Sequence, residues 1–107
     1  MSSRIAIKYG VKLSGLKPEI LIALLVAEKE YPSDGILTLT SALEGKHTIS
    51  SKHYTGYAID LRTRELSPHD AIEWRNRVAS ALGLDYDCIL EDDHLHIEFD
   101  PKRGACV

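Results

Sequence analysis

The sequence has few cysteines, no long apolar segment and little apolar character near its N-terminus. Its 107 residues include only Cys88 and Cys106, too few for a disulfide framework, so we expect a protein made and kept in a reducing cytoplasm. The longest apolar run, 20–27, is far shorter than the roughly 20 residues that cross a bilayer, so no transmembrane segment is expected. The N-terminus lacks an apolar stretch of the kind found in secretory signals, and we expect no signal peptide.

Basic residues are also not in excess. Lysine and arginine total 13 against 16 aspartate and glutamate, which gives a formal net charge of -3. Proteins that hold nucleic acid by neutralising phosphates are normally basic, so nucleic acid is not an expected partner. Hydrophobic residues make up 44% and charged residues 27%, typical of a globular chain with a buried core. We expect residues 1–107 to form a single domain.

Spacing and turn residues predict two helices and four strands. One helix begins at Pro18, is stopped by Pro32, and is apolar nearly all round, which predicts a largely buried helix. The second begins after the Ser67 cap and ends at Gly83, with Trp74 on its apolar stripe. Strands are predicted at 36–40, 57–62, 86–91 and 94–99, with 1–16 and 41–52 irregular. This order predicts an α+β domain whose small, mostly antiparallel sheet packs against two main helices.

The last predicted strand has one face of polar, potentially functional side chains and one apolar face. Because side chains alternate along a strand, one face receives His94, His96 and Glu98, and the other receives Leu95, Ile97 and Phe99. The simpler interpretation is a solvated face with two incidental histidines. The alternative is a face that binds metal or moves protons, in which Glu98 orients a histidine through a hydrogen bond.

A second histidine stands near a carboxylate in the middle of the chain. His53 precedes Asp60 by seven residues, and Gly56 permits a turn between them. A carboxylate between Ile59 and Leu61 is costly to bury unless something pairs with it. Asp60 could form a salt bridge with Arg62 or Lys52, or it could bind a metal ion. Together with a histidine of the last strand, His53 and Asp60 would supply the ligand types of catalytic zinc.

Two motifs in combination resemble a known family. They read Ser51-x-His53-x-x-Gly56-x-Ala58-x-Asp60 and Asp93-His94-x-His96-x-Glu98. This pair resembles the zinc-dependent D-Ala-D-Ala carboxypeptidases, which include the L-alanyl-D-glutamate endopeptidases of phage lysins and share a fold with the Hedgehog signalling domain. The resemblance spans Thr40 to Pro101. It implies a Hedgehog/DD-peptidase-like fold, one Zn²⁺ ion, and a peptidase acting on the stem peptide of bacterial peptidoglycan.

The resemblance also implies a role for each matching residue. His53, Asp60 and His96 match the zinc ligands, and Asp93 matches the catalytic acid and base. His94 matches an active-site histidine of some members. A competing register, with Glu91 as base and His94 as ligand, requires a shift of the motif.

Substrate contacts are implied less directly. Ser51 matches a position that binds the substrate peptide, and Tyr54 is the aromatic residue best placed to contact it. Many members hold the substrate carboxylate with an arginine, where this chain offers Lys46, a point cation without the guanidinium fork. The enzyme would reach the wall after release from the cell or from a phage particle. The alternative function is a non-catalytic zinc-containing binding domain on the same fold, which would have no use for an acid at Asp93.

Overall fold

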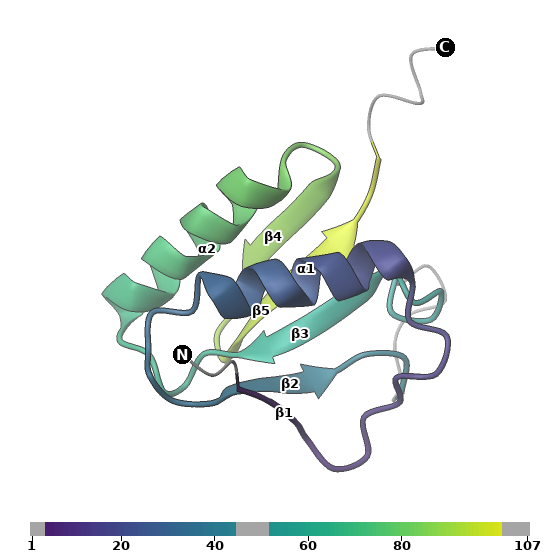
Figure 1. Ribbon diagram of the computed structural model, residues 1–107, viewed down its shortest axis with the longest axis horizontal. Coiled ribbons are helices and arrows are strands. Elements are labelled where there is room, and N and C mark those ends of the chain that lie inside the picture. Colours follow the sequence, from purple (N-terminus) through teal and green to yellow (C-terminus); the bar gives the residue numbers. More distant parts are fainter. Residues whose placement is uncertain (1–3, 45–51, 102–107) are drawn as a thin grey trace.

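The computed structural model describes residues 4–44 and 52–101 of the chain. Within these ranges it is a small α+β unit of two helices and five strands (Figure 1). In chain order the elements are β1 (Ile5–Ile7), α1 (Pro18–Lys29), β2 (Leu37–Ser41), β3 (Ala58–Arg62), α2 (Pro68–Leu82), β4 (Tyr86–Leu90) and β5 (His94–Phe99).

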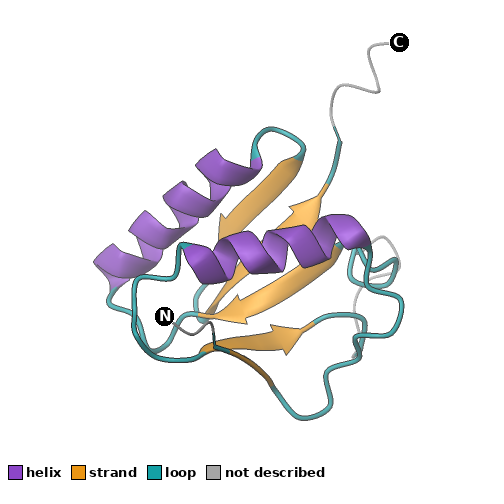
Figure 2. Cartoon of the chain, viewed as in Figure 1, coloured by secondary structure: helices purple, strands orange, loops and turns teal. Residues whose placement is uncertain are grey.

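The strands form one sheet in the order β1-β2-β3-β5-β4. Only β1 and β2 run parallel, and every other neighbouring pair is antiparallel. Both helices lie against the same face of this sheet, leaving the other face free of helices (Figure 2). The expected mostly antiparallel sheet with two main helices is therefore confirmed.

The core lies between the helices and the sheet. Its buried side chains include Ile20 and Ala23 of α1, Trp74 of α2, and alternate residues of the central strands: Ile59, Leu61, Leu95 and Ile97. Because alternate residues point to opposite faces, Asp60, His94, His96 and Glu98 lie on the helix-free face. The predicted division of the last strand into two faces is confirmed.

Helix α2 begins and ends as its sequence predicts. The Ser67 hydroxyl accepts a hydrogen bond from the Asp70 N–H at 3.1 Å, and Gly83 follows the last turn with φ of +87°. Trp74 is fully buried, and its indole N–H donates to the Ala27 carbonyl at 2.9 Å. The core role expected for Trp74 is confirmed, and its hydrogen bond ties α2 to the end of α1.

Two expectations are wrong. Residues 1–16 are not wholly irregular, because Ile5–Ile7 pairs in parallel with β2. A three-residue edge strand is too short to show alternation and takes its conformation from its partner. Helix α1 is also not largely buried: Leu21, Ile22 and Leu25 are 47, 54 and 63% exposed, because only one side of the helix meets the core.

Smaller differences concern element ends and membrane spans. The strand predicted at 36–40 runs from Leu37 to Ser41, and the strand predicted at 57–62 begins at Ala58. Within the described ranges, neither helix has the length and apolar character needed to cross a membrane.

Gly56 is placed where a side chain does not fit. Its φ is +82°, and a Cβ there would lie 2.2 Å from the Gly15 carbonyl oxygen. The same backbone contact is fixed by a hydrogen bond from the Lys17 N–H to the Gly56 carbonyl at 3.1 Å. Glycine is therefore required at this position of the turn that carries His53.

We expect Gly56→Ala to lower the free energy of unfolding by about 3 kcal/mol or more, since positive φ and the backbone contact both oppose a methyl group. Gly10→Ala is the matched control, because Gly10 has φ of +91° but nothing within 4 Å of its Cβ position. That control should cost only about 1 kcal/mol in urea unfolding. Equal losses for the two variants would show that the Gly15 contact contributes nothing.

Candidate metal centre

Three ligand-type side chains meet on the helix-free face. Asp60 of β3 lies directly opposite His96 of β5 in the antiparallel register. His53 enters from the turn before β3, which is closed by a hydrogen bond from the Gly56 N–H to the His53 carbonyl at 3.1 Å. Residues far apart in the sequence are thereby brought to one point.

The contacts within this group are short. His53 Nε2 lies 3.3 Å and His96 Nδ1 lies 2.8 Å from the same oxygen, Asp60 Oδ1. The ligand atoms of all three residues lie within 4.8 Å of one another. His53 is 4% exposed, so the group is closed on that side. The expected convergence of His53, Asp60 and His96 is confirmed as geometry.

The outer nitrogen of each imidazole has an oxygen acceptor. His53 Nδ1 lies 2.7 Å from the Ala42 carbonyl oxygen, and His96 Nε2 lies 2.9 Å from Glu98 Oε1. A carbonyl and a carboxylate can only accept, so each of these nitrogens carries the hydrogen. Both rings are held in orientation by these bonds, as in metal sites where ligand histidines donate outward.

With the hydrogens on the outer nitrogens, only acceptor atoms face the centre of the group. When both rings are neutral, the lone pairs of His53 Nε2 and His96 Nδ1 face Asp60 Oδ1, which is also an acceptor. Three acceptors are then directed at one another, and only a proton or a cation between them makes the arrangement favourable. Two imidazole nitrogens and a carboxylate oxygen are typical ligands of catalytic zinc. The residues present therefore fit a zinc ion.

Spacing agrees with that fit for one of the two histidine–aspartate pairs. Ligands about 2.0–2.2 Å from a tetrahedral ion lie roughly 3.3–3.6 Å apart. The His53–Asp60 separation of 3.3 Å falls in this range, and the His96–Asp60 separation of 2.8 Å is that of a direct hydrogen bond.

Protonation of the group follows from its contacts. Burial disfavours the ionised form of Asp60, but the histidines around it, His53 and His96 as hydrogen-bond partners when protonated and His94 through its charge, outweigh burial and hold its pKa well below the usual value. Burial also disfavours charged His96, yet hydrogen bonds to Asp60 and Glu98 raise its pKa to about 9. In the absence of metal, His96 therefore holds the proton between the two groups at neutral pH.

We expect metal-free protein to be most stable between pH of about 4 and 6.5. The lowered pKa of Asp60 contributes stability above its ordinary value of 3.8, and this is lost as the pH falls. The raised pKa of His96 contributes fully below its ordinary value of 6.5 and is lost as the pH rises through about 9. Melting curves in chelator from pH 4 to 9.5 measure this. A melting temperature that rises between pH 6.5 and 9 would contradict it.

Asp93 and His94 lie beside the three ligands. Asp93 is in the β4–β5 turn with an 83% exposed side chain, and its Oδ1 lies 2.6 Å from His94 Nδ1. This hydrogen bond lowers the pKa of Asp93. The other nitrogen of His94, Nε2, lies 3.8 Å from Asp60 Oδ1 and 3.7 Å from Glu91 Oε1. His94 thus stands between Asp93 and the candidate ligand Asp60.

The competing register is less favoured by geometry. His96 contacts Asp60 at 2.8 Å, whereas His94 is a full ångström farther away. The salt-bridge alternative for Asp60 is also not seen, because its ion pairs within the described ranges are with histidines. Lys52 instead pairs with Asp100 at 3.7 Å.

The expected substrate residues are only partly placed. Tyr54 follows His53 and is 41% exposed. Ser51 and Lys46 lie outside the described residues. Sequence reasoning missed the Ala42 carbonyl, which orients His53, because a backbone group leaves no signal in residue type. It also missed Thr40, whose hydroxyl donates to the Asp60 carbonyl at 3.2 Å and braces β3.

Comparison of the chain with protein-family models gave no match, and comparison with curated proteins gave none either.

Proposed function

We propose that this protein is a zinc peptidase that hydrolyses a peptide bond in the stem peptide of bacterial peptidoglycan. The observation that supports this most is the meeting of His53, Asp60 and His96 around one point, with the Asp93–His94 pair beside it. Three protein ligands leave a tetrahedral ion one further position, as catalytic zinc sites do. A fully closed set of ligands would instead favour a structural role.

Each side chain has a task in such a site. Zinc would supply a Lewis acid and a water molecule with a pKa of about 7. Ala42 and Glu98 keep the lone pairs of His53 and His96 directed inward. The carboxylate of Asp93 is ionised at neutral pH, as an aspartate ordinarily is, so it can accept a proton and later pass one to the leaving amine.

His94 positions this carboxylate. Its Nδ1 holds Asp93 Oδ1, while its Nε2 faces Asp60 and Glu91. The ring thereby links the proton-accepting group to the ligand cluster, and in its protonated form its Nε2–H would be a donor for the developing oxyanion.

Substrate binding is assigned to the residues around His53. We assign the exposed ring of Tyr54 to contact with the stem peptide, together with Ser51 and the ammonium of Lys46. A Lys46 ammonium would attract a substrate carboxylate as a point charge. The enzyme would meet its substrate after release from the cell or on a phage particle.

The direct test is hydrolysis of a synthetic stem pentapeptide ending in D-Ala-D-Ala. We expect the zinc-loaded full chain to produce fragments that mass spectrometry identifies as loss of D-Ala or internal cleavage. Asp60→Asn is the matched control and should produce neither. If the zinc-loaded wild type cleaves neither this peptide nor purified peptidoglycan, the protein is a zinc-containing binding domain instead.

A further inference from the structure

Strand β4 forms an edge of the sheet, and part of its backbone faces away from β5. Two backbone hydrogen bonds mark the ends of the β4–β5 ladder. The Glu91 N–H donates to the His94 carbonyl at 2.9 Å, and the Asp100 N–H donates to the Asp85 carbonyl at 2.7 Å. Because bonded pairs alternate in an antiparallel ladder, the backbone groups of Cys88 and Leu90 point outward. The Cys88 carbonyl confirms this direction, since it accepts a hydrogen bond from Arg75 Nε at 2.9 Å.

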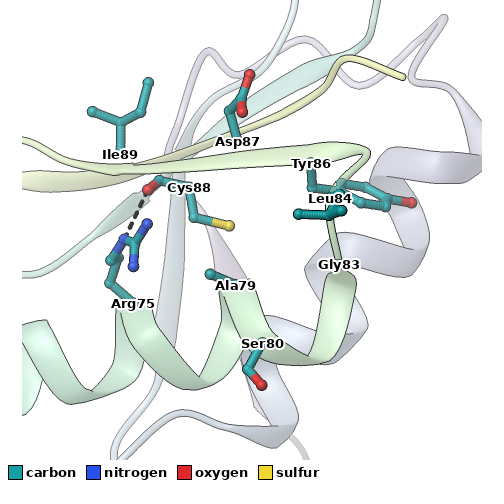
Figure 3. A pocket seen from close by; sticks show the side chains of 9 residues that line it. All are labelled: Arg75, Ala79, Ser80, Gly83, Leu84, Tyr86, Asp87, Cys88 and Ile89. Carbon is teal, nitrogen blue, oxygen red and sulfur yellow. Dashed lines mark hydrogen bonds between the residues drawn. The ribbon is translucent and has the colours of Figure 1, made fainter. Parts of the chain in front are cut away.

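A groove runs between this edge and the C-terminal half of α2. It encloses a volume of about 720 Å³. Arg75 and Ala79 extend from α2 towards the strand, whereas Asp87 and Ile89 point to the other side of β4 (Figure 3). Leu84, at the end of the groove, is 88% exposed, and Ile89 is 46% exposed. Apolar side chains are thus available on both sides of this strand edge.

Arg75 is the charged group of the groove. Arg75 is half-buried as a residue, and its guanidinium donates from Nε to the Cys88 carbonyl and from Nη1 to Asn76 Oδ1 at 2.8 Å. Neither acceptor is charged, and within residues 4–44 and 52–101 no carboxylate forms an ion pair with Arg75. Arg77, two residues further along the same helix, differs because it pairs with Glu73 at 3.5 Å. Arg75 therefore retains donors and a positive charge that suit a carboxylate from another molecule.

We propose that this groove binds an extended, acidic peptide segment, which adds a strand beside β4 and places a carboxylate at Arg75. The outward Cys88 N–H and the outward N–H and carbonyl of Leu90 supply the main-chain bonds of strand addition. Alternate side chains of the segment contact Ala79 and Leu84 on the helix side and Ile89 on the other. Ile89 lies directly opposite the candidate ligand His96 in the β4–β5 register, so this site borders the metal centre, but its main-chain bonds use no metal ligand.

The test is parallel selection of a displayed random heptapeptide library on the full chain and on Arg75→Gln. Peptides enriched on the wild type should share one aspartate or glutamate and should lack proline at alternate positions, since strand addition uses those N–H groups. The best peptide, made synthetically, should shift the NMR signals of the Cys88 and Leu90 amides. Its affinity should fall at least tenfold when its acidic residue becomes the amide.

Two variants separate binding from folding. Leu84→Glu changes an exposed residue, so the melting temperature should stay unchanged. The new carboxylate should repel the acidic peptide and lower its affinity at least tenfold. Arg77→Gln is the control on the same helix and should bind as wild type does. No enrichment over Arg75→Gln, or equal affinity for the acidic and amide peptides, would overturn the proposal. Sedimentation that shows wild-type dimers abolished by Leu84→Glu would also overturn it, because a second copy would then fill the groove.

Discussion

Asp93→Asn should lower the rate of stem-peptide hydrolysis by about 10²–10⁴, the usual contribution of general acid–base catalysis. The amide keeps the shape of the side chain but cannot accept the proton of an attacking water. Asp93 lies outside the ligand group, with an exposed side chain bonded to His94, so zinc content should remain that of the wild type. Initial rates and metal content of the same preparations measure both effects.

Asp92→Asn is the matched control, since Asp92 is an exposed carboxylate in the same turn. It should leave the rate unchanged. If Asp93→Asn hydrolyses the peptide at the wild-type rate, Asp93 is not the general base. Glu91, 3.7 Å from His94 Nε2, would then be the next base to test.

Removal of zinc should lower the melting temperature by about 10 °C or more. An ion that binds only the folded chain stabilises it by roughly 3–4 kcal/mol at free concentrations of 100 to 1,000 times its dissociation constant. In a domain of this size, each kcal/mol shifts the melting temperature by about 4–8 °C. His53, Asp60 and His96 come from the turn before β3, from β3 and from β5, so an ion bound by them would hold together parts of the chain distant in sequence.

His96→Ala should abolish this zinc-dependent shift together with hydrolysis. His69→Ala is the control, because His69 is exposed at the start of α2 and should retain the full shift. A melting temperature of the wild type that is the same with zinc and with chelator would contradict a bound metal.

Much of the fold was predictable because local signals agreed with tertiary packing. The alternation of Leu95 and Ile97 with His94 and His96 identified both faces of β5, and Ser67 and Gly83 marked the ends of α2. The short strand β1 was not predictable, because its conformation comes from pairing with β2. The exposure of Leu25 was missed for a related reason: an apolar helix sequence does not show how many of its sides meet other elements.

The side chains of the candidate site were predictable, but the groups that orient them by hydrogen bonds were not. The motif spacing indicated His53 and Asp60 as a pair, and the structure places them 3.3 Å apart. The Ala42 carbonyl that orients His53 lies eleven residues away and is a backbone group, so no residue pattern signals it. The close contact of His94 with Asp93 also depends on the turn geometry rather than on residue type.

The most direct test of the metal centre is the zinc content of the purified full chain, measured by mass spectrometry after exhaustive dialysis against buffer with trace zinc. The geometry predicts about one zinc ion per wild-type chain and loss of that ion in His53→Ala, Asp60→Asn and His96→Ala, each still folded by circular dichroism. A wild-type chain that binds no zinc, or the same zinc content in all three variants, would contradict the metal centre.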